Sequence, residues 1–98
     1  MSNPFNRRRE DRQQVTVYGR FRYMGRGYDI PLRDLSEKGC RFYDRYGRLE
    51  PGVQLQIRIA DIGPFASTVR WQADHVVGVE FDDPIYGPVL DHIYELSR

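Results

Sequence analysis

The chain contains very little cysteine and no long apolar segment. Its 98 residues include one cysteine, Cys40, so no disulfide can form within the chain, and this favours a reducing compartment. No apolar run approaches the roughly 20 residues that a membrane-spanning helix needs. The opening residues, MSNPFNRRR, lack the apolar segment of a secretory signal. We therefore expect a cytoplasmic protein that has no membrane partner.

Signatures of catalysis are missing as well. His75 and His92 lie far apart and have no cysteine or carboxylate at ligand spacing, so we expect no metal site. Neither Ser36 nor Ser67 stands in a nucleophile-elbow sequence, and no glycine-rich phosphate loop opens a helix. Cys40 falls where a strand residue should point inward, which is typical of a buried apolar side chain. We expect a binding protein with no enzymatic activity and no resident cofactor.

Lysine is scarce and arginine is abundant. The chain holds 15 Lys and Arg residues, of which only Lys38 is a lysine, against 14 Asp and Glu. Residues 1–48 hold 12 Lys/Arg and 6 Asp/Glu, a net charge of +6, whereas residues 49–98 hold 3 and 8, a net charge of −5. A general nucleic-acid binder usually carries a larger positive surplus, so this balance favours a local anion site. Compositional drift in a GC-rich genome is an alternative explanation of the arginine bias.

The hydrophobic periodicity predicts an all-β domain. Apolar and polar residues alternate in short segments, as in half-buried strands. The segments are residues 15–23, 28–32, 40–43, 53–59, 64–71 and 75–81. From residue 86 the period becomes that of a helix, whose apolar face comprises Tyr86, Val89, Leu90, Ile93 and Leu96. Because strands this short cannot build two large sheets, we predict a six-stranded antiparallel β-barrel with a C-terminal α-helix.

The first of two notable motifs is an arginine cluster. The sequence RRREDR at residues 7–12 contains Arg8-x-x-x-Arg12, with Arg7 and Arg9 beside Arg8, just before the first expected strand. A guanidinium is a planar fork of donors that can hold phosphate or a base edge with two parallel hydrogen bonds and can stack on a flat ring. The alternative is a solvated charge run whose pairs with neighbouring carboxylates contribute little to stability.

The second motif is the turn sequence DLSEKG between the second and third expected strands. It reads Asp34-x-Ser36-x-x-Gly39. The carboxylate of Asp34 is a hydrogen-bond acceptor. Asp34 and Ser36 also suit a turn through side-chain bonds to the backbone, and we expect Gly39 to be structural in either case.

Together the two motifs resemble the signature pair of the PilZ domain family, RxxxR followed about twenty residues later by [D/N]xSxxG. The segment VRWQADHVVGVEF is also similar to the family's penultimate hairpin, in which a Trp precedes a Val-Gly-Val-x-Phe strand. The resemblance implies a PilZ-type barrel in one domain, residues 7–98. Within it we expect an arginine arm at 7–12, the barrel at about 14–82 and the helix at about 86–97, after a flexible N-terminus at 1–6.

The resemblance further implies binding of the bacterial second messenger cyclic di-GMP. The implied ligand contacts are Arg7, Arg8, Arg9, Arg12, Asp34, Ser36 and Gly39. An arginine at position 7 is similar to family members that bind a stacked ligand pair. Arg41 and Arg70 point outward by alternation and are further candidates, while Trp71 suits either packing or a stacking platform.

The resemblance leaves the output of the domain open. Because no effector domain is recognised in the sequence, we expect the ligand-ordered arm to present a surface to an unidentified effector protein. One alternative is a degenerate PilZ-type adaptor that binds protein but no nucleotide. Another is a small barrel that binds single-stranded nucleic acid through arginines and aromatic residues. The aromatic candidates are Tyr18, Phe21, Tyr43 and Tyr46. The net charge of +1 disfavours nucleic acid.

Overall fold

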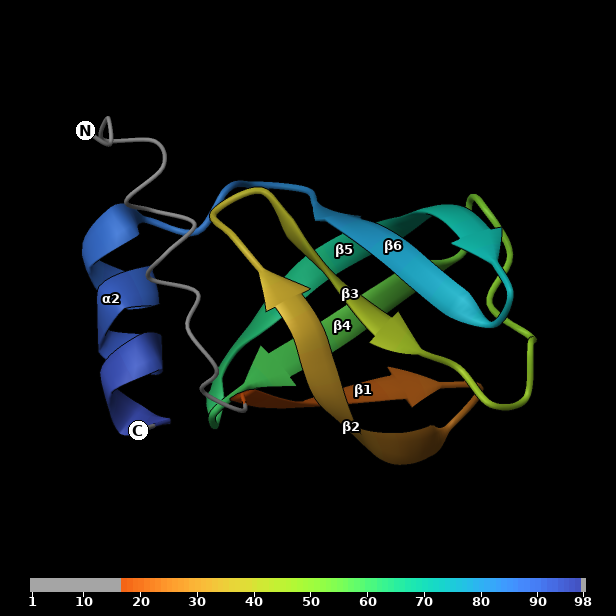
Figure 1. Ribbon diagram of the computed structural model, residues 1–98, viewed down its shortest axis with the longest axis horizontal. Coiled ribbons are helices and arrows are strands. Elements are labelled where there is room, and N and C mark those ends of the chain that lie inside the picture. Colours follow the sequence, from red (N-terminus) through yellow and green to blue (C-terminus); the bar gives the residue numbers. More distant parts are fainter. Residues whose placement is uncertain (1–16, 98) are drawn as a thin grey trace.

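The computed structural model describes residues 17–97, which form a closed antiparallel barrel with a helix at one end (Figure 1). The elements are β1 (Val17–Tyr23), β2 (Arg26–Leu35), β3 (Gly39–Tyr43), β4 (Gln54–Ile59), β5 (Ile62–Ala73), β6 (Val76–Phe81) and α2 (Gly87–Leu96). The strand order is β1-β2-β3-β6-β5-β4, and the pairing of β1 with β4 closes the barrel. The six-stranded antiparallel barrel and the C-terminal helix predicted from the sequence are confirmed.

The core fills the inside of the barrel because apolar residues alternate with polar ones along the strands. In β4, Leu55, Ile57 and Ile59 are buried and the residues between them are exposed. Phe21 of β1 and Phe42 of β3 stack within the core, with ring centroids 5.4 Å apart. A slip of one residue in any strand would turn this apolar set to solvent, so burial fixes the register.

Three of the hairpins are tighter than the sequence pattern predicts. Two-residue turns join β1 to β2, β4 to β5 and β5 to β6, and several non-glycine residues in them have positive φ: Met24, Ala60, Asp61, Asp74 and His75. Turns of this kind match the twist of the flanking strands, so the strands continue up to the turn. Consequently β2 begins at Arg26 rather than near residue 28, and β5 ends at Ala73 rather than at residue 71.

Helix α2 lies against one end of the barrel, where β2 turns into β3, and the β3–β4 loop lies at the other end (Figure 1). Pro88 stands in the first turn of α2, where its missing N–H needs no partner. Leu90 and Ile93 are buried, but Tyr86 is 73% exposed and Leu96 53% exposed. The five-residue apolar face expected from the sequence is therefore only partly buried, because these two residues stand at the helix ends and its centre contacts the barrel. No helix within residues 17–97 is long and apolar enough to cross a membrane.

Candidate functional site

The DLSEKG turn between β2 and β3 is held in one shape by its own hydrogen bonds. The Ser36 N–H donates to the Gly39 carbonyl at 2.9 Å, and the Lys38 N–H donates to Ser36 Oγ at 3.2 Å. A Cβ on Gly39 would collide with the backbone carbonyl of Val79. Only glycine lets β3 approach β6 this closely, so Ser36 and Gly39 both shape the turn.

The same turn is fixed to the C-terminal segment. The Ile85 N–H, just before α2, donates to the Glu37 carbonyl at 2.8 Å. The Tyr94 hydroxyl of α2 donates to the Leu35 carbonyl at 2.6 Å. Turn and helix therefore form two connected walls of one site.

A row of residues crosses four strands beside this turn. Asp34 of β2 pairs in register with Arg41 of β3. Arg41 pairs with Gly78 of β6, and Gly78 pairs with Trp71 of β5. Since neighbouring strands lie about 4.8 Å apart, the row spans roughly 14 Å. Arg41 Nη2 donates to Asp34 Oδ2 at 2.9 Å, so the row begins with an ion pair and ends with an indole.

Trp71 occupies its position because of a bulge and a glycine. The β5–β6 ladder shifts register between Val69 and Trp71, and both Arg70 and Trp71 are exposed as a result. A Cβ on Gly78 would collide with the Trp71 indole, which covers this glycine. Trp71 is still 41% exposed, so it packs on the barrel and also presents an aromatic face to solvent.

These elements border an open hollow of about 740 Å³. Small-molecule sites commonly measure about 300–1,000 Å³. Six of the candidate residues line it: Asp34, Ser36, Gly39, Arg41, Arg70 and Trp71. The remaining candidates, Arg7, Arg8, Arg9 and Arg12, lie outside the described residues. The structure thus gathers the described candidates in one place, and their role as ligand contacts stays a prediction.

The charges around the hollow are mixed. Its charged lining residues are Asp34, Glu37, Lys38, Arg41, Arg70, Glu80 and Asp91. Arg70 Nε donates to Glu80 Oε1 at 2.7 Å, and the Arg41 guanidinium is paired with Asp34. Within residues 17–97 the hollow therefore has more carboxylates than cations, and it offers hydrogen-bond acceptors as well as donors.

A family model for the PilZ domain matches residues 6–96. The chain belongs to the PilZ domain family. The match covers nearly the whole chain and confirms the resemblance drawn from the RxxxR and DxSxxG motifs. PilZ domains are known as cyclic di-GMP receptors and as binding or adaptor domains. Neither the curated proteins nor the solved structures gave a significant match.

The hollow of this PilZ domain also includes residues that the motifs did not indicate, among them Glu80, Asp91 and Tyr94. Glu80 follows Gly78 by two positions on the outer face of β6, so strand alternation was a signal for it. Asp91 and Tyr94 join the site only because α2 packs beside the β2–β3 turn, and no local motif gives that packing.

Cys40 also borders the hollow and is 5% exposed. Burial raises the pKa of its thiol to about 12, and the nearby charge of Asp34 acts in the same direction. A thiol in this state is neutral and a poor nucleophile, so the expectation that Cys40 is a buried apolar side chain is confirmed. No cluster of metal-ligating side chains occurs among residues 17–97.

Proposed function

We propose that this PilZ domain binds cyclic di-GMP in the hollow. Binding orders the arginine arm at residues 7–12, and the ordered arm transmits the signal to a partner protein. The observation that carries the proposal is the outer row from Asp34 to Trp71 beside the DLSEKG turn. Family membership supports the ligand class, and the row supplies groups suited to a purine.

The barrel would read the guanine bases. Guanine offers N1 and N2 as donors and O6 and N7 as paired acceptors. Asp34 lines the hollow, and its carboxylate is an acceptor suited to N1 and N2. Arg41 can donate to O6 or N7, and Trp71 offers a face on which a base can stack.

The arginine arm would hold the phosphates. The described part of the hollow has more carboxylates than cations, and Arg41 and Arg70 are already paired. Two phosphates therefore need further cations, and Arg8 and Arg12 are the motif residues that the family pattern assigns to the ligand. Fixing the arm costs about 1–2 kcal/mol of backbone entropy per residue. Charge-assisted hydrogen bonds of about 1.5–3 kcal/mol each can offset this cost.

The ordered arm would then form the surface that the partner protein recognises. A partner that binds the closed arm has a higher affinity for the liganded domain than for the free one, and this difference in affinity transmits the signal. The domain itself would carry out no reaction.

Isothermal titration of the full chain with cyclic di-GMP tests the proposal. We expect saturable binding, and the stoichiometry distinguishes one ligand from a stacked pair. Arg20→Gln serves as a control, because Arg20 pairs with Asp29 on the exposed face of β1 and β2 and does not line the hollow. Absence of binding to the unaltered chain would overturn the proposal. It would favour the alternative of a degenerate PilZ-type adaptor that binds protein but no nucleotide.

A further inference from the structure

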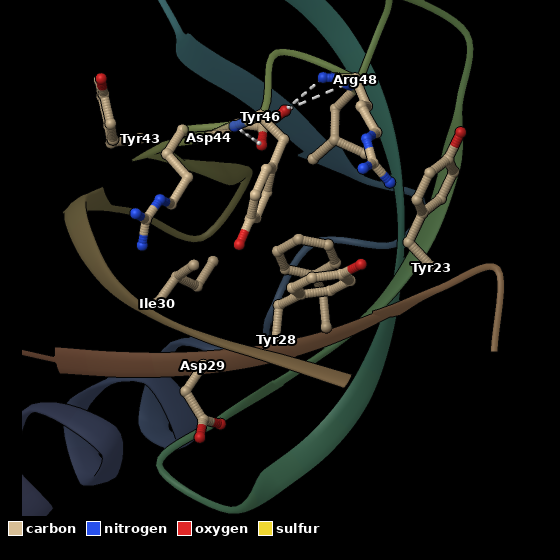
Figure 2. Close-up of a pocket in the computed structure, with 11 residues that line it drawn as sticks. Tyr23, Tyr28, Asp29, Ile30, Tyr43, Asp44, Tyr46 and Arg48 are labelled. Carbon is tan, nitrogen blue, oxygen red and sulfur yellow. Dashed lines mark hydrogen bonds between the residues drawn. The ribbon is translucent and has the colours of Figure 1, made fainter. Parts of the chain in front are cut away.

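A second, smaller hollow lies beside the β3–β4 loop (Figure 2). Figure 1 shows this loop at the end of the barrel away from α2. The volume of the hollow is about 180 Å³, and β1, β2 and the loop after β3 line it. The Tyr28 ring stacks on Phe21 at a centroid distance of 5.1 Å and faces Tyr46 at 6.2 Å. Figure 2 shows Tyr46 projecting from the loop towards Tyr28 and Ile30. The space is below the roughly 300 Å³ of small-molecule sites and suits a single apolar side chain.

The loop that carries Tyr46 has a fixed conformation. The Asp44 carboxylate, in a residue only 7% exposed, accepts three backbone hydrogen bonds. The donors are the N–H groups of Tyr46 at 3.1 Å, Arg48 at 2.9 Å and Leu49 at 3.1 Å (Figure 2). A preformed loop loses little conformational entropy when a partner binds, which favours recognition at this surface.

The rim of this hollow carries positive charge. The Arg45 and Arg48 guanidinium carbons lie 5.5 and 5.3 Å from the centre of the Tyr46 ring. Both arginines are exposed, and neither forms an ion pair with any of residues 17–97. The Asp29 carboxylate at the edge of the hollow is paired with Arg20 at 2.6 Å. Two guanidinium groups without an ion-pair partner in residues 17–97 therefore lie beside Tyr46, a residue that is 55% exposed.

We propose that this Tyr46 site, defined as Tyr28, Arg45, Tyr46 and Arg48, binds an acidic segment of a partner protein. A carboxylate of the segment meets Arg45 and Arg48, and a neighbouring aliphatic side chain enters the hollow between the tyrosines. Because neither guanidinium is paired within residues 17–97, an anionic partner suits them, and a carboxylate can take a bidentate hydrogen bond from arginine. Tyrosine and arginine are also the residue types that dominate binding energy at protein interfaces. The proposed peptide binding does not require cyclic di-GMP, so a failure of the nucleotide proposal would leave this one unaffected.

An NMR titration of the ¹⁵N-labelled full chain tests this site. The probe is an acetylated peptide of sequence GSDLEDG, and the matched control is GSNLQNG, which keeps the leucine and removes the charges. We expect the acidic peptide to shift the amide signals of Tyr46 and Arg48 and the neutral peptide to bind more weakly. The double variant Arg45→Gln/Arg48→Gln should lower the affinity at least about 10-fold. The variant Arg33→Gln/Arg58→Gln removes the same charge elsewhere on the barrel and should bind the acidic peptide as the unaltered chain does.

Tyr46→Ala provides a second variant, because an exposed loop residue can be truncated without disturbing the core, and it should also weaken peptide binding. Equal affinity for the two peptides, or an unchanged affinity in the Arg45→Gln/Arg48→Gln variant, would overturn the proposal. Absence of any shift up to about 1 mM peptide, the weak end of the affinity scale, would overturn it as well. Tighter binding of oligouridylate than of the acidic peptide at the same residues would assign the surface to single-stranded nucleic acid instead.

Discussion

The indole of Trp71 rests on Gly78, and this contact keeps the only tryptophan of the chain on the outer face of the barrel beside the candidate nucleotide hollow. The indole has a partly exposed face, and a base of the ligand can lie against it. The chain also has seven tyrosines, but its tryptophan emission, excited selectively, comes from this one position.

We predict that saturation with cyclic di-GMP changes the tryptophan emission and that Gly78→Ala weakens binding. The added Cβ would collide with the indole and displace it. Loss of a stacking contact worth about 1–3 kcal/mol corresponds to a decrease in affinity of roughly 5- to 150-fold. Fluorescence titration measures both effects, with thermal unfolding to confirm that the variant is folded. Unchanged emission at saturation together with unchanged affinity of the variant would exclude Trp71 from the site.

Asp34→Ala should impair binding of guanine ligands selectively. The carboxylate can accept from N1 and N2 of guanine, whereas adenine lacks this pair of donors. We expect the affinity for cyclic di-GMP to fall about 10-fold or more and the weaker affinity for cyclic di-AMP to change little. Parallel calorimetric titrations with the two ligands measure the difference. An equal loss for both would show that Asp34 acts through the turn or through Arg41 and does not read the base.

Arg12→Ala should weaken cyclic di-GMP binding by roughly 10- to 100-fold, the loss expected when one charge-assisted hydrogen bond of about 1.5–3 kcal/mol is removed. Arg12 lies outside the described residues, so this prediction comes from the RxxxR motif alone. Calorimetry on Arg12→Ala and on the Arg20→Gln control measures it. The same affinity in the two variants would remove the arm from ligand binding.

The stability that the protonated Cys40 thiol contributes to the fold should be lost in alkaline solution. Its thiol has a pKa of about 12 in the folded protein against an ordinary value of 9.0, so the fold binds the proton more tightly. The contribution of Cys40 to stability is complete below pH 9 and is lost as the pH rises from 9 towards 12. Near pH 10 the loss is on the order of 1 kcal/mol.

Urea unfolding of the unaltered chain and of Cys40→Val at about pH 8 and pH 10 isolates this effect from the titration of tyrosine and lysine. We expect the unaltered chain to lose more stability between the two pH values than the variant loses. Equal losses would mean that the thiol is accessible to solvent in the folded protein.

Periodicity was sufficient to predict the barrel, because a half-buried strand must alternate and α2 must present an apolar face. It did not predict the hairpin ends, since residues such as Ala60 and His75 adopt positive φ without the glycine that usually marks such turns. It also left the orientation of Trp71 open. The bulge before Trp71 interrupts the alternation, and a bulge depends on the pairing of β5 with β6.

Only the part of the candidate site whose contacts are local in sequence could be predicted from the sequence. Ser36 and Gly39 lie within one turn, and the turn chemistry of the motif is visible in the sequence. The contacts of Arg41 with Asp34 and of Arg70 with Glu80 depend on the register between strands. The contribution of Tyr94 depends on the docking of α2. Long-range geometry of this kind could not be predicted from the periodicity of single segments.

The most direct test of the account is a map of the amide and indole N–H signals of ¹⁵N-labelled protein during titration with cyclic di-GMP. We predict that the largest shifts occur at Asp34, Ser36, Arg41 and the Trp71 indole, with little change at Tyr28 and Tyr46. Largest shifts at the far end of the barrel, or no shifts at saturating ligand, would contradict the assignment of the nucleotide to the hollow beside the DLSEKG turn.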